Sequence, residues 1–261
     1  MKWLNILLLI YLLGGIAVYF LQDRFLFHPL VVARDQLYNF PNPNREINIG
    51  FDSASNINIV QFTVPQPRGV VLYLHGNKNN ISWYAKYATN FTSRGYEVWM
   101  LDYPRFGKST GILSEQRLHD YSEQIYLLAR ARFAADSIII YGKSLGTGLA
   151  AWLASKKSCK RLILECPYYS MTSLVAHYLP IYPVNTLIRF RMPTYSYLQL
   201  VNAPISIFHG TNDELIPYSN AERLKELMQP KDEFVSIPDA GHNNLNDSKV
   251  FQRKLDSLLQ H

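Results

Sequence analysis

Hydrophobic residues along the chain recur in two alternating patterns. Short runs rich in β-branched and aromatic residues predict buried strands, whereas the segments between them place apolar residues three or four positions apart, as on one face of a helix. The predicted buried strands are 69–76, 96–103, 137–142, 161–166, 204–210 and 233–238. The predicted helices are 81–93, 115–133, 145–157, 219–229 and 248–260. Strands that alternate with helices predict an α/β fold with a mostly parallel sheet covered on both faces.

The first residues predict a membrane segment. Residues 3–21 contain no charged side chain, and as a helix they would extend about 28 Å, close to the thickness of the hydrocarbon layer. The alternative is a secretory signal, whose apolar core is usually shorter and ends at a small-x-small cleavage site. We therefore expect an uncleaved anchor over residues 1–22 and one globular domain over 23–261. The basic residues flanking the anchor slightly favour an extracytoplasmic domain.

Composition narrows the classes of partner. Hydrophobic residues make up 48% of the chain and charged residues 18%, which is typical of a globular protein. The formal charge of +6 comes without a nucleic-acid-binding motif, so a membrane surface or a merely solvated basic face is expected rather than nucleic acid. The seven histidines show no ligand-like pairing with carboxylates or cysteines, so we expect no metal and no cofactor. The oligomeric state stays open.

The stretch IIIYGKSLGTG, residues 138–148, could be a phosphate-binding loop or a turn that exposes a serine. A phosphate-binding loop needs a glycine five residues before the glycine of its Gly-Lys-Ser, and Ser137 stands there. The same test rejects 107–109, where Asp102 occupies the required position. The residues Gly142-Lys143-Ser144-Leu145-Gly146 instead fit the G-x-S-x-G elbow, a strained turn between strand and helix. Ser144 is therefore the candidate nucleophile.

Two later residues could activate this serine. A serine nucleophile needs a base and a group that orients the base, and on this type of elbow they follow in the order acid, then histidine. Asp213 follows the strand at 204–210, and His242 follows the strand at 233–238. Asp213 could instead be a turn residue, and Glu214 is an alternative acid. His242 could be a structural histidine, but the ordered set favours a Ser-His-Asp triad.

An acyl transfer also needs donors for the oxyanion. Two backbone N–H groups usually serve, and Leu145, directly after the serine at the start of a helix, supplies one. The turn after the strand at 69–76 should supply the other, most naturally from Asn77. His75 in the same turn is expected to be structural.

Six segments together carry a family resemblance. They are HGNKNN, LDYPRFGKSTG, GKSLGTG, ECPYYSM, HGTNDELIP and DAGHNN. This set resembles the small membrane-anchored serine hydrolases of the α/β-hydrolase superfamily, a group that includes protein depalmitoylases and related esterases. The resemblance implies an α/β-hydrolase fold. It also implies roles for five residues: Ser144 as nucleophile, Asp213 as acid, His242 as base, and Asn77 and Leu145 as oxyanion donors.

The sequence departs from that family pattern in two loops. Pro104-Arg105 stands where members usually carry Arg-Gly, and Lys78 and Asn79 stand where small residues are usual. Both loops are expected near the mouth of the site, so they bear on substrate preference rather than on the catalytic residues.

Residues 167–200 form an insert rich in Tyr, Leu and Ile, where this fold usually carries a cap. Short helices packed over the sheet and a pocket for an acyl chain are both compatible with it. The residues expected to supply apolar area above Ser144 are Tyr168, Tyr169, Tyr178, Leu179, Ile181 and Tyr182.

The sequence therefore predicts a membrane-anchored serine hydrolase that cleaves carboxylic esters or thioesters, with a small or lipid-like acyl substrate. A serine peptidase or amidase is the alternative within enzymes, since the same triad supports it. A catalytically silent, membrane-anchored binding module is the alternative outside them.

Overall fold

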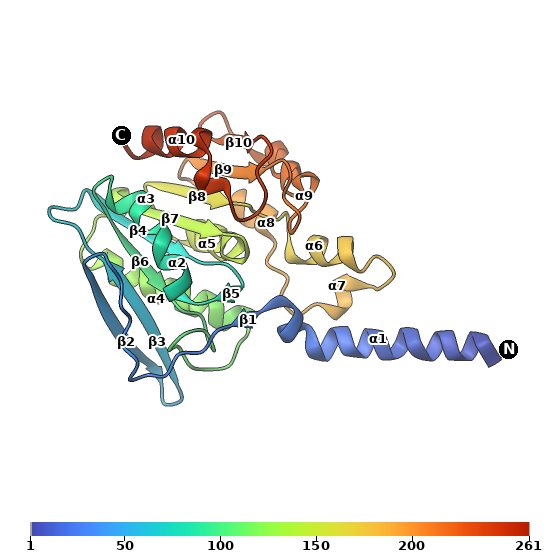
Figure 1. Cartoon of the computed structure of the whole chain (residues 1–261). Helices are drawn as coiled ribbons and strands as arrows, with labels where there is room; N and C mark the ends of the chain where they lie inside the picture. The colour runs from blue at the N-terminus through green and yellow to red at the C-terminus, as the bar shows by residue number, and fades with distance from the viewer. Residues whose placement is uncertain (1, 261) are drawn as a thin grey trace.

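An eight-stranded sheet crosses the globular part of the computed structural model, which describes residues 2–260 (Figure 1). The strand order is β10-β9-β8-β7-β4-β6-β3-β2. Only the β2–β3 and β3–β6 pairs are antiparallel, so the sheet is mostly parallel, as predicted. These strands are β2 (Asn44–Asp52), β3 (Ser55–Phe62), β4 (Gly69–Leu74), β6 (Tyr96–Leu101), β7 (Ile138–Lys143), β8 (Arg161–Glu165), β9 (Ile205–Gly210) and β10 (Glu233–Ile237). A separate short parallel pair joins β1 (His28–Pro29) to β5 (Lys78–Asn79).

Helices cover both faces of the sheet because its central strands are apolar on both sides. Ile138 and Ile140 of β7 pack into one core with α4 and α5, whereas Ile139 and Tyr141 pack into the other with α2, α3 and α10. The helices of these layers are α2 (Ile81–Tyr84), α3 (Thr89–Thr92), α4 (Glu115–Arg130), α5 (Leu145–Lys156), α9 (Tyr218–Glu222) and α10 (Lys249–Gln260). Short 3₁₀ helices are η1 (Ala85–Tyr87), η2 (Ala135–Ser137), η3 (Arg223–Leu227) and η4 (Leu245–Asp247).

Two predicted helices are shorter than expected. The segment 81–93 divides into α2, η1 and α3, and the segment 219–229 into α9 and η3. The side chain of Asn80 caps α2 by accepting from the Ser82 N–H at 2.9 Å, so this helix begins as predicted. The apolar face is still buried in both segments, because a 3₁₀ helix also keeps residues three positions apart on the same side.

The predicted anchor is one continuous helix, α1 (Lys2–Leu26), which projects from the domain (Figure 1). Its mean hydropathy is 2.3 over the most apolar window, and that window is not buried in the structure. The insert forms α6 (Met171–Tyr178), α7 (Val184–Leu187) and α8 (Thr194–Leu198). The turn between α6 and α7 lies beside α1 in Figure 1, although about 170 residues separate the two in sequence.

A buried histidine in α4 makes fold stability depend on pH. His119 stacks on Trp152 of α5 with ring centroids 4.1 Å apart, and burial lowers its pKa from 6.5 to about 4. Between these two pH values the unfolded chain binds a proton that the folded chain does not, so the free energy of unfolding falls as the pH falls.

We expect acidification from pH 7.5 to 5 to remove about 2 kcal/mol from the free energy of unfolding through His119 alone. A His119→Phe variant keeps an aromatic ring on Trp152 and has no titrating group. The same acidification should therefore lower its free energy of unfolding by about 2 kcal/mol less. The measurement is urea unfolding of the full chain in mild detergent at both pH values. Equal losses in the two proteins would contradict the assignment.

Candidate active site

Ser144 stands on a strained turn between β7 and α5. Its backbone angles are φ 53° and ψ −120°, a conformation that a residue other than glycine rarely adopts. The flanking glycines permit this turn, because a Cβ at Gly142 would lie 2.7 Å from the Thr147 Cα and one at Gly146 would collide with the Leu74 carbonyl. The serine side chain is therefore presented at the carboxyl end of the strand, as in a G-x-S-x-G elbow.

Asp213 and His242 meet at the same edge of the sheet. Asp213 lies in the loop after β9 and His242 in the loop after β10, and His242 Nδ1 lies 2.8 Å from Asp213 Oδ2. The second carboxylate oxygen accepts from the N–H groups of Leu215 and Ile216 at 2.9 and 2.8 Å. Burial alone would raise the pKa of Asp213, but the hydrogen bond and charge of His242 and the Ile216 N–H lower it below its usual range. Asp213 is thus an ionised partner that can hold the imidazole.

The alternative residues lie elsewhere. Glu214 is exposed, and none of the described contacts of the His242 ring is to the Glu214 side chain. His75 is fully buried, with its ring 4.2 Å from that of Tyr103 between centroids. Ser109 accepts a hydrogen bond from the Asn58 N–H at 2.8 Å. His75 and Ser109 are therefore structural.

A buried ion pair that the sequence analysis missed ties the His242 loop to the elbow. Lys143 pairs with Glu165 at the end of β8, and both side chains are almost fully buried. Asn246 also donates to Glu165 at 2.9 Å, and Lys143 Nζ lies 3.4 Å from the His242 carbonyl oxygen. Burial alone would lower the pKa of Lys143, but Glu165 more than offsets it and raises that pKa. The pair therefore joins β7, β8 and the loop of His242. The sequence signal for this pair was two oppositely charged residues, one at the end of each of two apolar strands.

The two predicted oxyanion donors, Leu145 and Asn77, lie around the same cavity as Ser144. Leu145 is the first residue of α5, and the N–H groups of a first helical turn have no partner within the helix. Asn77 follows β4, next to β7 in the sheet. Its carbonyl accepts from the His28 N–H at 2.8 Å, and its side chain donates to the Leu26 carbonyl at 2.8 Å. The end of α1 and the start of β1 thus fix the Asn77 turn, which the sequence did not predict.

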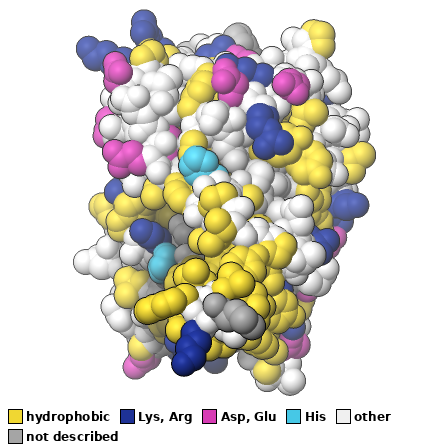
Figure 2. Space-filling view, turned by 90° about the vertical axis from the view of Figure 1, so that its right-hand side faces the viewer, with side chains coloured by type: hydrophobic (Ala, Val, Ile, Leu, Met, Phe, Trp, Pro, Cys, Tyr) yellow, Lys and Arg dark blue, Asp and Glu magenta, His cyan; other side chains and the backbone are white. Residues whose placement is uncertain are grey.

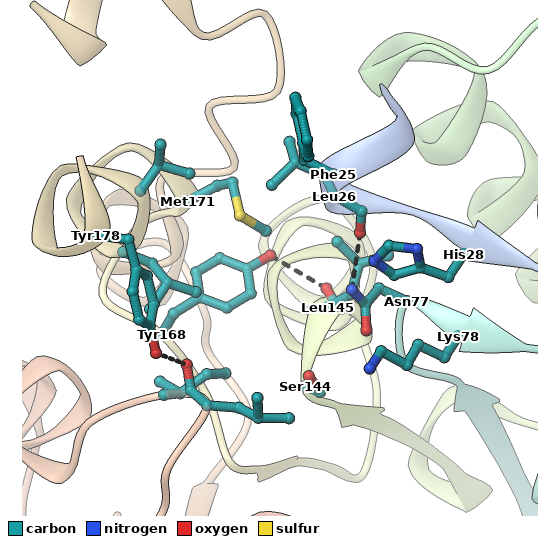
Figure 3. Close-up of a pocket in the computed structure, with 14 residues that line it drawn as sticks. Phe25, Leu26, His28, Asn77, Lys78, Ser144, Leu145, Tyr168, Met171 and Tyr178 are labelled. Atoms are coloured by element: carbon teal, nitrogen blue, oxygen red, sulfur yellow. Dashed lines mark hydrogen bonds between the residues drawn. The ribbon is translucent and has the colours of Figure 1, made fainter. Parts of the chain in front are cut away.

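A cavity of about 270 Å³ contains Ser144, Leu145 and Asn77 (Figure 3). Three parts of the chain supply its other walls. They are the end of α1 and β1 with Phe25, Leu26 and His28, the cap with Tyr168, Met171, Leu174, Val175 and Tyr178, and the loops with Lys78, Leu215 and Ile216. Lys78, one of the predicted departures, lies beside Ser144 in Figure 3. The lining is mostly apolar, with a cation at one side.

The predicted cap residues divide into two groups. Tyr168 and Tyr178 line the Ser144 cavity, but Tyr169, Leu179, Ile181 and Tyr182 do not. Tyr169 stacks on Tyr195 with centroids 4.6 Å apart, and Tyr182 stacks on Tyr11 of α1. The expectation for these four residues was wrong: the turn after α6 carries Leu179, Ile181 and Tyr182 away from the site and toward α1, whereas Tyr169 lies before α6 and packs on Tyr195.

One buried thiol adjoins the site. The Sγ of Cys166 and the side-chain donor atoms of Asp213 and His242 lie within 4.8 Å of one another, close enough to surround a metal ion. Burial raises the pKa of the Cys166 thiol well above its usual value, so the thiolate that a metal needs is disfavoured at neutral pH. The Asp213–His242 hydrogen bond also occupies one nitrogen of the ring.

Comparisons with known proteins agree with this fold. The profile of the family described as serine aminopeptidase S33 matches residues 65–197, about half of the chain. The alpha/beta hydrolase domain-containing protein 17C of Xenopus tropicalis is 28% identical over 76% of this chain and 63% of its own length. An uncharacterized Mycobacterium tuberculosis protein is 29% identical over 69% of this chain and 66% of its own length. The chain thus spans slightly less than two thirds of these relatives.

The fold also matches solved structures. An esterase of Pyrococcus furiosus superposes with a TM-score of 0.69 over 89% of this chain and 98% of its own, at 17% identity. The sheet order, the elbow and the loops at the strand ends define an α/β hydrolase. Within that superfamily, the chain belongs to the serine aminopeptidase S33 family of hydrolases.

Proposed function

We propose that the chain is a membrane-anchored serine hydrolase that cleaves carboxylic ester or thioester bonds of acyl substrates. The observation that carries this proposal is the strained Ser144 in an apolar cavity, at the sheet edge where Asp213 holds His242. Ser144 Oγ attacks the carbonyl carbon while His242 Nε2 takes the hydroxyl proton. The N–H groups of Asn77 and Leu145 stabilise the oxyanion.

The reaction then continues in two steps. The protonated His242 gives its proton to the leaving alcohol or thiol, and the acyl group stays on Ser144 as an ester. A water molecule, deprotonated by His242, attacks this acyl-enzyme and releases the carboxylic acid. Asp213 keeps the imidazole in the tautomer that both proton transfers need.

The membrane part of the proposal rests on α1. Its 25 residues extend about 37 Å, enough to cross a bilayer. Removal of this helix as a signal would break built contacts: Gln22 is buried, and its side chain donates to the Leu187 carbonyl at 3.1 Å. Asp23 pairs with Arg189 at 2.6 Å. Such contacts favour a retained anchor over a cleaved signal.

Aminopeptidase activity, which the description of the family names, is the second candidate. An aminopeptidase must hold the free amino group of a peptide, and a carboxylate is the usual partner for that cation. None of the described residues around the Ser144 cavity is Asp or Glu, whereas Lys78 and His28 are present. This lining favours an ester or thioester with an apolar acyl chain.

We expect kcat/KM to rise from acetyl to butyryl to octanoyl esters, because each methylene buried in the cavity contributes up to about 0.8 kcal/mol. Matched thioesters should follow the same order, and matched amides should turn over far more slowly. A flat profile with chain length, or faster cleavage of amides, would contradict the proposed substrate class.

A Val175→Phe variant narrows the cavity and should remove most of the octanoyl advantage, with acetyl ester turnover within about twofold of the original. Val250→Phe on α10, a partly exposed position away from the cavity, is the matched control and should keep the full profile. If kcat/KM depended on chain length in the same way in both variants, the acyl chain would bind outside this cavity.

A further inference from the structure

The turn between α6 and α7 presents an apolar surface with no charge. Residues 178–188, here called the cap tip, read YLPIYPVNTLI and lie between His177 and Arg189. Ile181 is 70% exposed and Tyr178 is 52% exposed, which is unusual for large apolar side chains in water. Hydrophobic side chains gather on this face of the molecule, from which α1 projects (Figure 2).

The cap tip is packed along α1. The ring of Tyr182 stacks on Tyr11 at 4.9 Å between centroids, and a Cβ at Gly14 would collide with the Tyr182 hydroxyl. At the other end of the contact, the Arg189 N–H donates to Gln22 Oε1 at 2.7 Å. The two elements therefore lie side by side over three turns of α1.

This contact fixes the depth of the cap tip. Tyr11 precedes Gln22 by eleven residues, which is about 16 Å along the helix and about half the thickness of the hydrocarbon layer. The Asp23–Arg189 ion pair lies just beyond Gln22, where charges belong at a membrane surface. A bilayer that surrounds α1 from this pair toward Lys2 must also surround Ile181 and Tyr182.

We propose that the cap tip inserts beside α1 into the leaflet next to the domain, and that the acyl substrate enters the Ser144 cavity from that leaflet. This inference rests on the proposed function, because it names how the substrate reaches the same site. Phe25 and Leu26 of α1 and Val175 and Tyr178 of α6 all line the cavity, so α1 and the helix that leads into the cap tip together form one side of its wall.

The backbone of the cap tip suits a medium without water. Polar backbone groups in lipid must find partners within the protein, and proline lacks the N–H that would need one. Pro180 and Pro183 occupy the turn itself, and the Ile181 carbonyl accepts from the Tyr11 hydroxyl at 3.1 Å. Further internal hydrogen bonds include Tyr182 N–H to Leu179 O, Val184 N–H to Tyr182 O, and Thr186 Oγ1 to Pro183 O.

A groove between α1 and the cap tip has a lining that suits an acyl chain. Its volume is about 330 Å³. The residues that line it are Tyr11, Leu12, Gly15, Ile16, Tyr19, Phe20, Tyr182, Pro183 and Leu187. None of them is charged, so chains of the surrounding lipid fill the groove. Asn185, an exposed amide of the cap tip, lies on α7, which leads back toward the surface.

Quenching by brominated lipids tests the insertion. The full chain with Ile181→Cys carries an environment-sensitive fluorophore in phosphatidylcholine vesicles, in a Cys159→Ser background because Cys166 is fully buried. Leu13→Cys in α1 reports the anchor, and Ser53→Cys in the exposed β2–β3 turn reports the aqueous side. Lipids brominated on the acyl chain should quench the Ile181 and Leu13 labels but not the Ser53 label.

Each failure has a different meaning. Quenching at Leu13 without quenching at Ile181 would overturn the insertion and leave the anchor in place. Absence of quenching at Leu13 would overturn the anchor and the insertion together. Hydrolysis of a soluble acetyl ester by the same samples is measured separately, so a failure of the proposed chemistry would show there and nowhere else.

An Ile181→Asp variant tests the route of the substrate. A carboxylate disfavours burial of the cap tip in lipid, so turnover of a long-chain ester held in vesicles should fall roughly tenfold. Turnover of a soluble acetyl ester should change by less than about twofold. Leu127→Asp, a partly exposed position on α4, is the matched control and should change neither rate. An equal loss on both substrates, or no loss on either, would overturn entry from the leaflet.

Discussion

Replacement of Ser144 by alanine is expected to lower kcat for a simple activated ester by about six orders of magnitude, to near the background of binding alone. The reason is that no acyl-enzyme can form without the Oγ that the elbow presents. Steady-state turnover of the purified full chain in mild detergent is the measurement. The KM of any residual activity should change little, because the cavity walls stay in place.

The chain contains its own control for this change. Ser109 stands in a second Gly-Lys-Ser, and its Oγ accepts a backbone hydrogen bond from Asn58 rather than facing the cavity. A Ser109→Ala variant should lose about 1 kcal/mol of stability and keep its kcat. Comparable loss of kcat in both variants would mean that the alanine acts through the fold and that Ser144 is not the nucleophile.

Replacement of Asp213 by asparagine is expected to lower kcat by about four orders of magnitude. The carboxylate that accepts from His242 becomes an amide, so the imidazole loses the partner that fixes its tautomer and stabilises its protonated form. The bonds from the Leu215 and Ile216 N–H groups to the other oxygen can persist, so the loop should keep its shape. Comparison of kcat with that of a Glu214→Gln variant checks the assignment of the acid.

Glu214 is exposed and adjacent in sequence, so its amide variant should keep kcat within about twofold. A larger loss in Glu214→Gln than in Asp213→Asn would reverse the assignment. Melting temperatures of both variants separate this result from unfolding, since of these two residues only Asp213 is a buried, hydrogen-bonded carboxylate.

The sheet could be predicted from the sequence because its strands carry their own signal. Runs such as 69–74 and 138–143 are apolar on both faces, which occurs where helices cover a parallel sheet. The elbow was predictable for a similar reason, since Gly142 and Gly146 stand where any Cβ would meet backbone or side-chain atoms. The order of Asp213 and His242 after late strands then placed them at the same edge.

The walls of the cavity could not be predicted in the same way. Phe25 and Leu26 follow the segment that hydropathy assigns to the membrane, yet the same helix continues through them and its last turn reaches the site. The direction of the cap tip depends on contacts between Tyr182 and Tyr11, which are distant in sequence. The Lys143–Glu165 pair likewise exists only once β7 and β8 are side by side. Such long-range contacts leave no periodic pattern in the chain.

The central claim is that Ser144 carries the acyl group during turnover. Mass spectrometry after reaction of the full chain with a fluorophosphonate probe tests it most directly, since such a probe leaves its phosphonyl group on an activated serine. We expect one adduct per chain, on the peptide that contains Ser144, and no adduct in Asp213→Asn over the same time. An adduct on another residue, or unreacted Ser144 in a protein that hydrolyses esters, would contradict the account.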